Sequence, residues 1–101
     1  MILGTWFLVG GFSKMRFCPD GTWHERAGSF YLHGSYTLVE DVLTLVTLEK
    51  RWRDQKVRYE EYVAIETQIA SLDENSLRFK GAVRHSSAGI TRDEKEVLYR
   101  R

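Results

Sequence analysis

Residues 30–50 read FYLHGSYTLVEDVLTLVTLEK, and the alternation in this stretch is typical of antiparallel strands. In an extended chain the odd-numbered residues 43–47 and the even-numbered residues 42–48 would lie on opposite faces. Glu40 and Asp41 are turn formers placed between the two alternating segments. The stretch therefore predicts a hairpin with one strand at 30–39 and the next at 42–50.

Short alternating segments separated by turn residues continue along the whole chain. Turns or loops are expected at 10–11, 19–21, 27–29, 40–41, 51–56, 73–75 and 86–89. The strands expected between them are 2–9, 12–18, 22–26, 30–39, 42–50, 57–69, 77–83 and 92–100. Such short connections favour antiparallel pairing of sequence neighbours. We therefore expect one all-β domain over residues 1–101, an eight-stranded antiparallel up-and-down barrel with little or no helix.

The segment 57–70 is the one place where a helix competes with a strand. Tyr59, Tyr62 and Val63 fall near helical spacing, but apolar residues at odd positions and β-branched side chains favour a strand. Glu61 interrupts the odd-numbered series. A helix here would change the fold class to α+β.

Bulk properties limit the functions that the chain can have. Its 101 residues suit one domain, and a net charge of +1 gives no strong long-range field for a polyanion or an anionic membrane. Cys18 is the single cysteine, so an intrachain disulfide is excluded. The sequence shows neither a signal-peptide pattern nor an apolar run of membrane-spanning length. We therefore expect a cytoplasmic protein that does not enter the membrane.

Several spaced signals occur in a fixed order: Gly4-Thr5-Trp6, Asp20-Gly21, Gly34-Ser35-Tyr36-Thr37-Leu38, Leu43-Thr44-Leu45 and Tyr99-Arg100. This order resembles the lipocalin-like families of small bacterial proteins, over about residues 2–100. The resemblance implies that Trp6 plugs one end of the barrel and that Arg100 lies over its ring, a cation–π contact. The chain is much shorter than a lipocalin and lacks the helix after the barrel, which argues against a large ligand cavity.

Alternation and resemblance together place a set of apolar and aromatic side chains toward the barrel axis. Such residues could hold a small apolar or aromatic molecule, with tyrosines supplying polar contacts. The expected ligand-binding residues are Met15, Phe17, Trp23, Tyr36, Leu45, Tyr59, Val63 and Phe79. The leading hypothesis is thus a non-enzymatic binding protein. The same residues could equally fill the core, which would leave an interaction or inhibitor module that acts through its surface.

The hairpin region around residues 50–59 is rich in basic and aromatic residues. Arg51, Trp52 and Arg53 form a candidate interface, for which a homodimer is the expected partner. Bases could also stack on Trp52 and Tyr59, so single-stranded nucleic acid is a further alternative. The net charge and the following Glu60 and Glu61 argue against it.

Motifs for chemistry are weak in this sequence. His24, His33 and His85 lie on different segments without metal-ligand spacing, so we expect neither a metal site nor a cofactor. His33 is expected to face outward. Cys18 beside a turn has no feature that would activate it. Glu25 and Glu61 are candidates for carboxylates that face the interior, where each would need a partner. We do not expect an enzyme.

Overall fold

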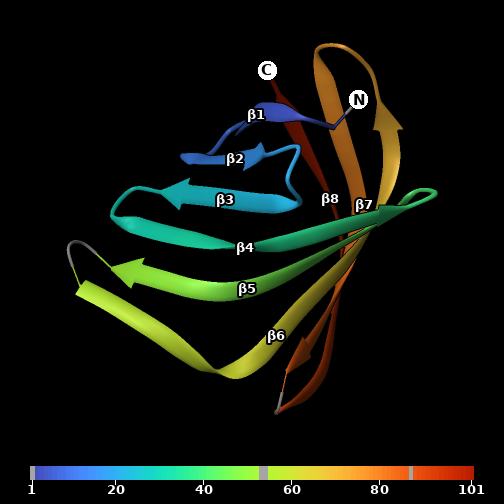
Figure 1. Cartoon of the computed structure of the whole chain (residues 1–101). Helices are drawn as coiled ribbons and strands as arrows, with labels where there is room; N and C mark the ends of the chain where they lie inside the picture. The colour runs from blue at the N-terminus through green and yellow to red at the C-terminus, as the bar shows by residue number, and fades with distance from the viewer. Residues whose placement is uncertain (1, 53–54, 87) are drawn as a thin grey trace.

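A computed structural model describes the backbone of residues 2–52, 55–86 and 88–101, and their side chains except those of residues 52–63. Eight antiparallel strands form a closed barrel in sequence order (Figure 1), which confirms the expected fold class. The strands are β1 Gly4–Leu8, β2 Ser13–Phe17, β3 Thr22–Ala27, β4 Phe30–Val39, β5 Val42–Trp52, β6 Gln55–Leu72, β7 Ser76–Ser86 and β8 Gly89–Arg100. The barrel closes where β1 pairs with β8, through the two register pairs Phe7↔Arg100 and Leu8↔Tyr99.

The structure corrects two expectations about the hairpin of β5 and β6. A polar loop was expected at 51–56, but β5 continues to Trp52 and β6 begins at Gln55, with Arg51 opposite Lys56. The charged composition of this stretch is therefore compatible with strands and is not a loop signal. The helix alternative for 57–70 is wrong, because this segment belongs to β6. No helix long and apolar enough to span a membrane occurs among the described residues.

Register shifts explain why β6 looked ambiguous in the sequence. Its pairing with β5 shifts between Thr47 and Glu49, and its pairing with β7 shifts between Thr67 and Gln68 and again between Ile69 and Ser71. The first shift sets residues 59–62 of β6 against Leu48 of β5, the second adds Gly81 to β7, and the third adds Ala70 to β6. A period of two is thereby broken into spacings that approach those of a helix.

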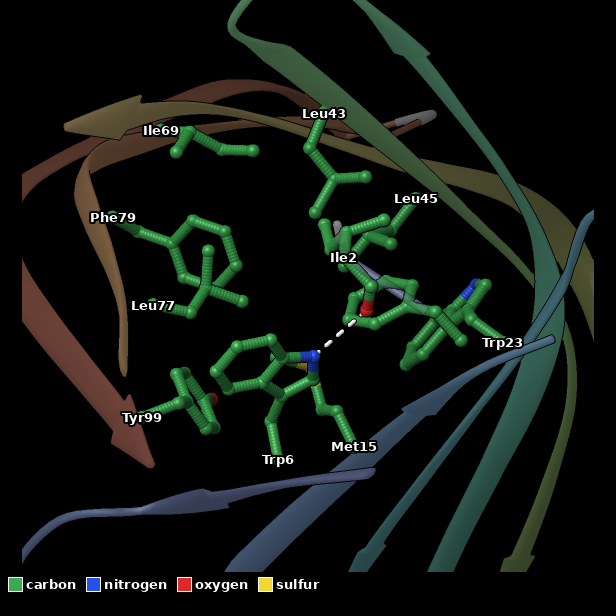
Figure 2. Close-up of a cluster of buried hydrophobic side chains, with 11 residues drawn as sticks. Ile2, Trp6, Met15, Trp23, Leu43, Leu45, Ile69, Leu77, Phe79 and Tyr99 are labelled. Atoms are coloured by element: carbon green, nitrogen blue, oxygen red, sulfur yellow. Dashed lines mark hydrogen bonds between the residues drawn. The ribbon is translucent and has the colours of Figure 1, made fainter. Parts of the chain in front are cut away.

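The core lies on the inner face at one end of the barrel (Figure 2). The buried cluster consists of Ile2, Trp6, Met15, Phe17, Trp23, Leu43, Leu45, Ile69, Leu77, Phe79 and Tyr99. Both buried indoles have hydrogen-bond partners, since Trp6 Nε1 donates to Ile2 O (2.8 Å) and Trp23 Nε1 donates to Val46 O (3.2 Å). Burial of each large apolar side chain contributes roughly 1.5–3 kcal/mol, so this cluster is the main source of stability.

Strands β4 and β5 approach each other closely at Gly34. A Cβ atom at this position would lie 1.7 Å from the backbone oxygen of Val46. The β4–β5 register shifts between His33 and Gly34, as in a bulge that bends a strand around a barrel. Only glycine fits this approach, and beyond it β4 runs alongside the core residues Leu45 and Leu43 of β5.

Candidate functional site

A pocket of about 180 Å³ lies beside the core and is called the inner pocket below. The residues that line it are Glu25, Ala27, Phe30, Leu32 and Lys50. These residues come from three adjacent strands and are register partners, with Ala27 opposite Phe30 and Leu32 opposite both Glu25 and Lys50. Since cross-strand partners share a face, the pocket lies on the inner face of β3, β4 and β5. Leu32 also packs against the core cluster, so the pocket borders directly on the core.

Glu25 is the polar group of the inner pocket. Ser13 Oγ of β2 donates a hydrogen bond to Glu25 Oε1 at 2.9 Å. Burial raises the pKa of the Glu25 carboxyl above its usual range, and the hydrogen bond from Ser13 offsets only part of this rise. The carboxyl is therefore easier to protonate than an exposed glutamate.

Tyr99 of β8 faces the same group of side chains from across the barrel. Burial, followed by the negative charge of Glu25, raises the pKa of the Tyr99 phenol to about 12, while the Ser13 hydroxyl lowers it slightly by hydrogen bonding. Ser13, Glu25 and Tyr99 thus form one polar cluster at the boundary between the core and the inner pocket. Such a cluster can donate and accept hydrogen bonds inside an otherwise apolar wall.

The other end of the inner pocket is formed by Lys50 and Phe30. Lys50 Nζ lies 4.6 Å from the centroid of the Phe30 ring, a cation–π contact, and Phe30 is 37% exposed. An ammonium group and a partly buried carboxyl therefore line one small pocket with apolar walls.

Most of the expected ligand-binding residues converge, but they pack against each other. Met15, Phe17, Trp23, Leu45 and Phe79 are each at most 6% exposed and belong to the core cluster. They belong to the core next to the inner pocket and do not line the pocket itself. The side chains of Tyr59 and Val63, which were also expected to bind ligand, lie outside the described residues.

Tyr36 was expected to offer its hydroxyl to a ligand, and the structure places it elsewhere. The hydroxyl donates to the backbone oxygen of Cys18 at 2.9 Å, and the ring meets Phe17 edge-on at 5.1 Å between centroids. Burial is the main cause that raises the pKa of the Tyr36 phenol, and the charges of Cys18 and Asp20 raise it further. Tyr36 therefore fastens the turn after β2 to β4.

Trp6 is fully buried, but the arginine over its ring is not the expected one. Arg101 Cζ lies 4.0 Å from the Trp6 ring centroid, whereas Arg100 is exposed. The physical reason is the period of two along β8. Because Tyr99 points into the core, Arg100 points outward, and the next residue returns to the side of Trp6.

The expected interface residues are only partly within the described side chains. Arg51 Nε forms an ion pair with Glu49 Oε1 at 2.7 Å, and its guanidinium lies 5.9 Å from the Tyr31 ring centroid. The side chain of Trp52 and all of Arg53 lie outside the described residues. An interface at this hairpin stays a prediction.

The histidines divide into a pair and a separate residue. His24 and His33 are directly opposite on β3 and β4, with ring centroids 5.7 Å apart, whereas His85 lies on β7 near Glu66. No cluster of three or more potential metal-ligating side chains occurs in the described part of the chain. Cys18 is half-buried at the end of β2, and the side chain of Glu61 lies outside the described residues.

Sequence reasoning identified Glu25 as an inward carboxylate but missed the other pocket residues. Ala27 and Phe30 flank a turn and Lys50 follows a bulge, so alternation alone could not assign them to one face. No protein-family model, curated protein or solved structure matches this chain. The function therefore has to be inferred from the geometry of the chain itself.

Proposed function

We propose that the protein is a non-enzymatic binding protein whose inner pocket takes a small, mostly apolar molecule with one hydroxyl group. The observation that supports this proposal is the carboxyl of Glu25, held by Ser13 at the wall of a pocket of about 180 Å³. Burial of a carboxyl opposes folding, as its raised pKa indicates. A ligand hydroxyl that donates to this carboxyl would compensate for the lost hydration.

The volume limits the size of the ligand. Pockets for drug-sized molecules occupy roughly 300–1,000 Å³, which is more than the inner pocket offers. An apolar cavity of about 150 Å³ is enough for benzene. A single aromatic ring or a short aliphatic chain therefore fits against Ala27, Phe30 and Leu32.

Charge favours a neutral ligand over a cationic one. Lys50 lines the same pocket as Glu25 and would repel an amine. A neutral hydroxyl can donate to Glu25 while its ring contacts the apolar walls. Phenols and aromatic alcohols are the chemical class that satisfies both conditions.

Binding requires fewer groups than catalysis here. An acyl- or phosphoryl-transfer site needs a nucleophile with an adjacent base, or a metal. Among the described residues, those that line the inner pocket supply one carboxyl and one ammonium group as ionisable side chains. We therefore propose recognition without a chemical step.

A titration with phenol and benzyl alcohol, followed by amide chemical shifts in NMR, tests the proposal. We expect saturable shifts at Glu25, Ala27 and Leu32, and their loss in Ala27→Leu, which fills the pocket. Ala88→Leu is the matched control, because Ala88 is exposed outside the pocket. The proposal fails if millimolar probe shifts nothing, or if the shifts persist unchanged in a folded Ala27→Leu variant.

An interaction module is the second candidate, and exposed apolar residues favour it. Val39, Val42 and Leu48 are 69%, 44% and 59% exposed on β4 and β5. A second copy of this chain could cover this strip. Sedimentation equilibrium of the wild type and of Leu48→Asp tests it, since a dimer that dissociates in the variant supports this candidate and a wild-type monomer at all concentrations contradicts it.

A further inference from the structure

The outer face of β1–β4 carries a second concavity, here called the outer hollow, of about 430 Å³. It is lined by Thr5, Lys14, Arg16, His24, Glu25, Arg26 and Tyr31. Along β3 the side chains alternate, so His24 and Arg26 point away from the face on which Glu25 meets Ser13. Glu25 borders both concavities, but its carboxyl lies on the inner face with Ser13, so β3 stands between the outer hollow and the inner pocket.

The sheet register arranges the outward side chains in two cross-strand rows. One row runs Thr5, Arg16, His24, His33 and Glu49, and the other runs Phe7, Lys14, Arg26, Tyr31 and Arg51. Lys14 therefore stands directly opposite Arg26, and Arg16 directly opposite His24. Like charges directly opposite each other destabilise a sheet. Strands β2 and β3 therefore carry this unfavourable repulsion on their outer face.

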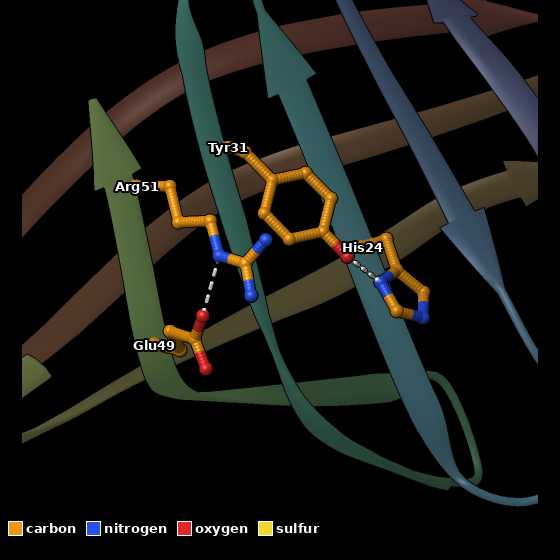
Figure 3. Close-up of polar contacts among 4 residues, drawn as sticks. All are labelled: His24, Tyr31, Glu49 and Arg51. Atoms are coloured by element: carbon orange, nitrogen blue, oxygen red, sulfur yellow. Dashed lines mark hydrogen bonds and ion pairs between the residues drawn. The ribbon is translucent and has the colours of Figure 1, made fainter. Parts of the chain in front are cut away.

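His24 and Tyr31 join the two rows (Figure 3). The Tyr31 hydroxyl is hydrogen-bonded to His24 Nδ1, and with the hydroxyl donating, the neutral ring carries its hydrogen on Nε2. Burial lowers the pKa of His24, and the positive charges of His33 and Arg16 lower it further, while Asp20 opposes them. Positive charge therefore outweighs the negative charge of Asp20 at His24.

Two carboxylates border the rows, and each already has a partner. Asp20 accepts hydrogen bonds from Thr22 N (3.0 Å) and Thr22 Oγ1 (2.6 Å), and Glu49 pairs with Arg51 (2.7 Å). They stand at two sides of the cationic group and would repel a long polyanion that crossed it. A compact anion in the hollow meets Lys14, Arg16, Arg26 and His24, and the carboxyl of Glu25, which also lines the hollow, is bonded to Ser13 on the inner face.

We propose that the outer hollow binds a small organic phosphate through Lys14, Arg16, Arg26 and His24. Guanidinium groups bind phosphate oxygens through paired N–H donors, and lysine adds a point charge. A bound phosphate removes the cross-strand repulsion between Lys14 and Arg26. It also favours the protonated form of His24, whose Nε2–H then donates a charge-assisted hydrogen bond to the phosphate.

Inorganic pyrophosphate at constant ionic strength is the probe for the test. Calorimetric titration gives the affinity of the wild type, Arg26→Gln and the matched control Arg92→Gln, in which an exposed arginine of β8 is replaced. We expect about tenfold weaker binding in Arg26→Gln, the loss of one charge-assisted contact, and no change in Arg92→Gln. Equal effects of the two substitutions would show that only net charge matters and would overturn the proposal.

Histidine NMR titrations supply a readout that does not depend on protein stability. Pyrophosphate should raise the pKa of His24 and leave the ring signals of His85 on β7 in place. Equal shifts at the two histidines would contradict a site in the outer hollow. A single-stranded oligonucleotide is the second probe. If it binds more tightly than pyrophosphate and its affinity increases with its length, the ligand is a polymer and the proposal is overturned.

Discussion

Arg101 covers the indole of Trp6 and so brings the last residue of the chain against β1. Its Cζ lies 4.0 Å from the ring centroid, and Nη1 donates to Leu3 O at 2.8 Å. Its backbone N also donates to Asn75 O at 3.1 Å, in the turn between β6 and β7. Because β1 and β8 share only two register pairs, these contacts of Arg101 add to the closure of the barrel.

Replacement of Arg101 by alanine should destabilise the protein by about 1–2 kcal/mol, through loss of the cation–π contact and of the charged hydrogen bond. Urea denaturation followed by tryptophan fluorescence measures the effect. Arg101→Lys should recover only part of the loss, since lysine keeps the charge but not the planar group. Arg100→Ala is the control, with a change within about 0.5 kcal/mol; a larger effect at Arg100 would restore the assignment made from the sequence.

Gly34→Ala should be among the most destabilising substitutions in the chain. The new Cβ would lie 1.7 Å from Val46 O, the same oxygen that accepts the hydrogen bond from Trp23 Nε1. Because the obstacle is backbone, β4 and β5 must separate, at a cost of about 3 kcal/mol or more. Thermal unfolding measures the loss, and failure to fold would agree with the prediction.

Gly28→Ala separates steric conflict from the general effect of removing a glycine. Gly28 has a φ of 60° and an open environment, so alanine there costs only about 1–2 kcal/mol of left-handed strain. A Gly34→Ala variant as stable as Gly28→Ala would show that β4 and β5 do not approach as closely as described.

The sequence predicts strand β4 to the residue, because turn formers flank ten alternating residues at both ends. It places the start of β8 at 92, while the strand begins at Gly89, since Gly89, Ile90 and Thr91 are all exposed and show no alternation of burial. The assignment of Arg100 over Trp6 failed by one position. A shift of one residue in a strand moves every side chain to the other face of the sheet. A motif near a chain end does not determine which residues of the strand face inward.

The candidate sites were less accessible to sequence reasoning than the fold. Inward apolar residues such as Phe17 and Trp23 were identified, but a packed core and a lined cavity have the same pattern. Only three-dimensional packing separates them. The outer hollow needs the register of four strands, because Lys14 and Arg26 become neighbours only when β2 and β3 are aligned.

Glu25→Gln should stabilise the protein at neutral pH. The folded pKa of Glu25 is raised above its ordinary value of 4.5, so the unfolded chain releases the proton first. Ionisation of Glu25 therefore does not change the stability below about pH 4.5. The stability falls as the pH rises from there through the folded pKa, and it stays reduced at higher pH. Thermal unfolding from acid to neutral pH should show an advantage for Glu25→Gln that disappears in acid. Glu74→Gln, in the exposed turn after β6, is the control and should show no such trend.

Ionisation of Tyr99 should depend on the charge of Glu25. The Tyr99 phenol has a pKa of about 12, against an ordinary value of 10.0, through burial and then through the Glu25 carboxylate. The unfolded chain loses this proton first, so stability should fall as the pH rises from 10.0 toward 12. Ultraviolet titration of phenolate, with Tyr99→Phe to assign the signal, gives the pKa. In Glu25→Gln the pKa of Tyr99 should move toward its ordinary value, and an unchanged pKa would mean that burial alone sets it and that Glu25 does not face Tyr99 across the barrel.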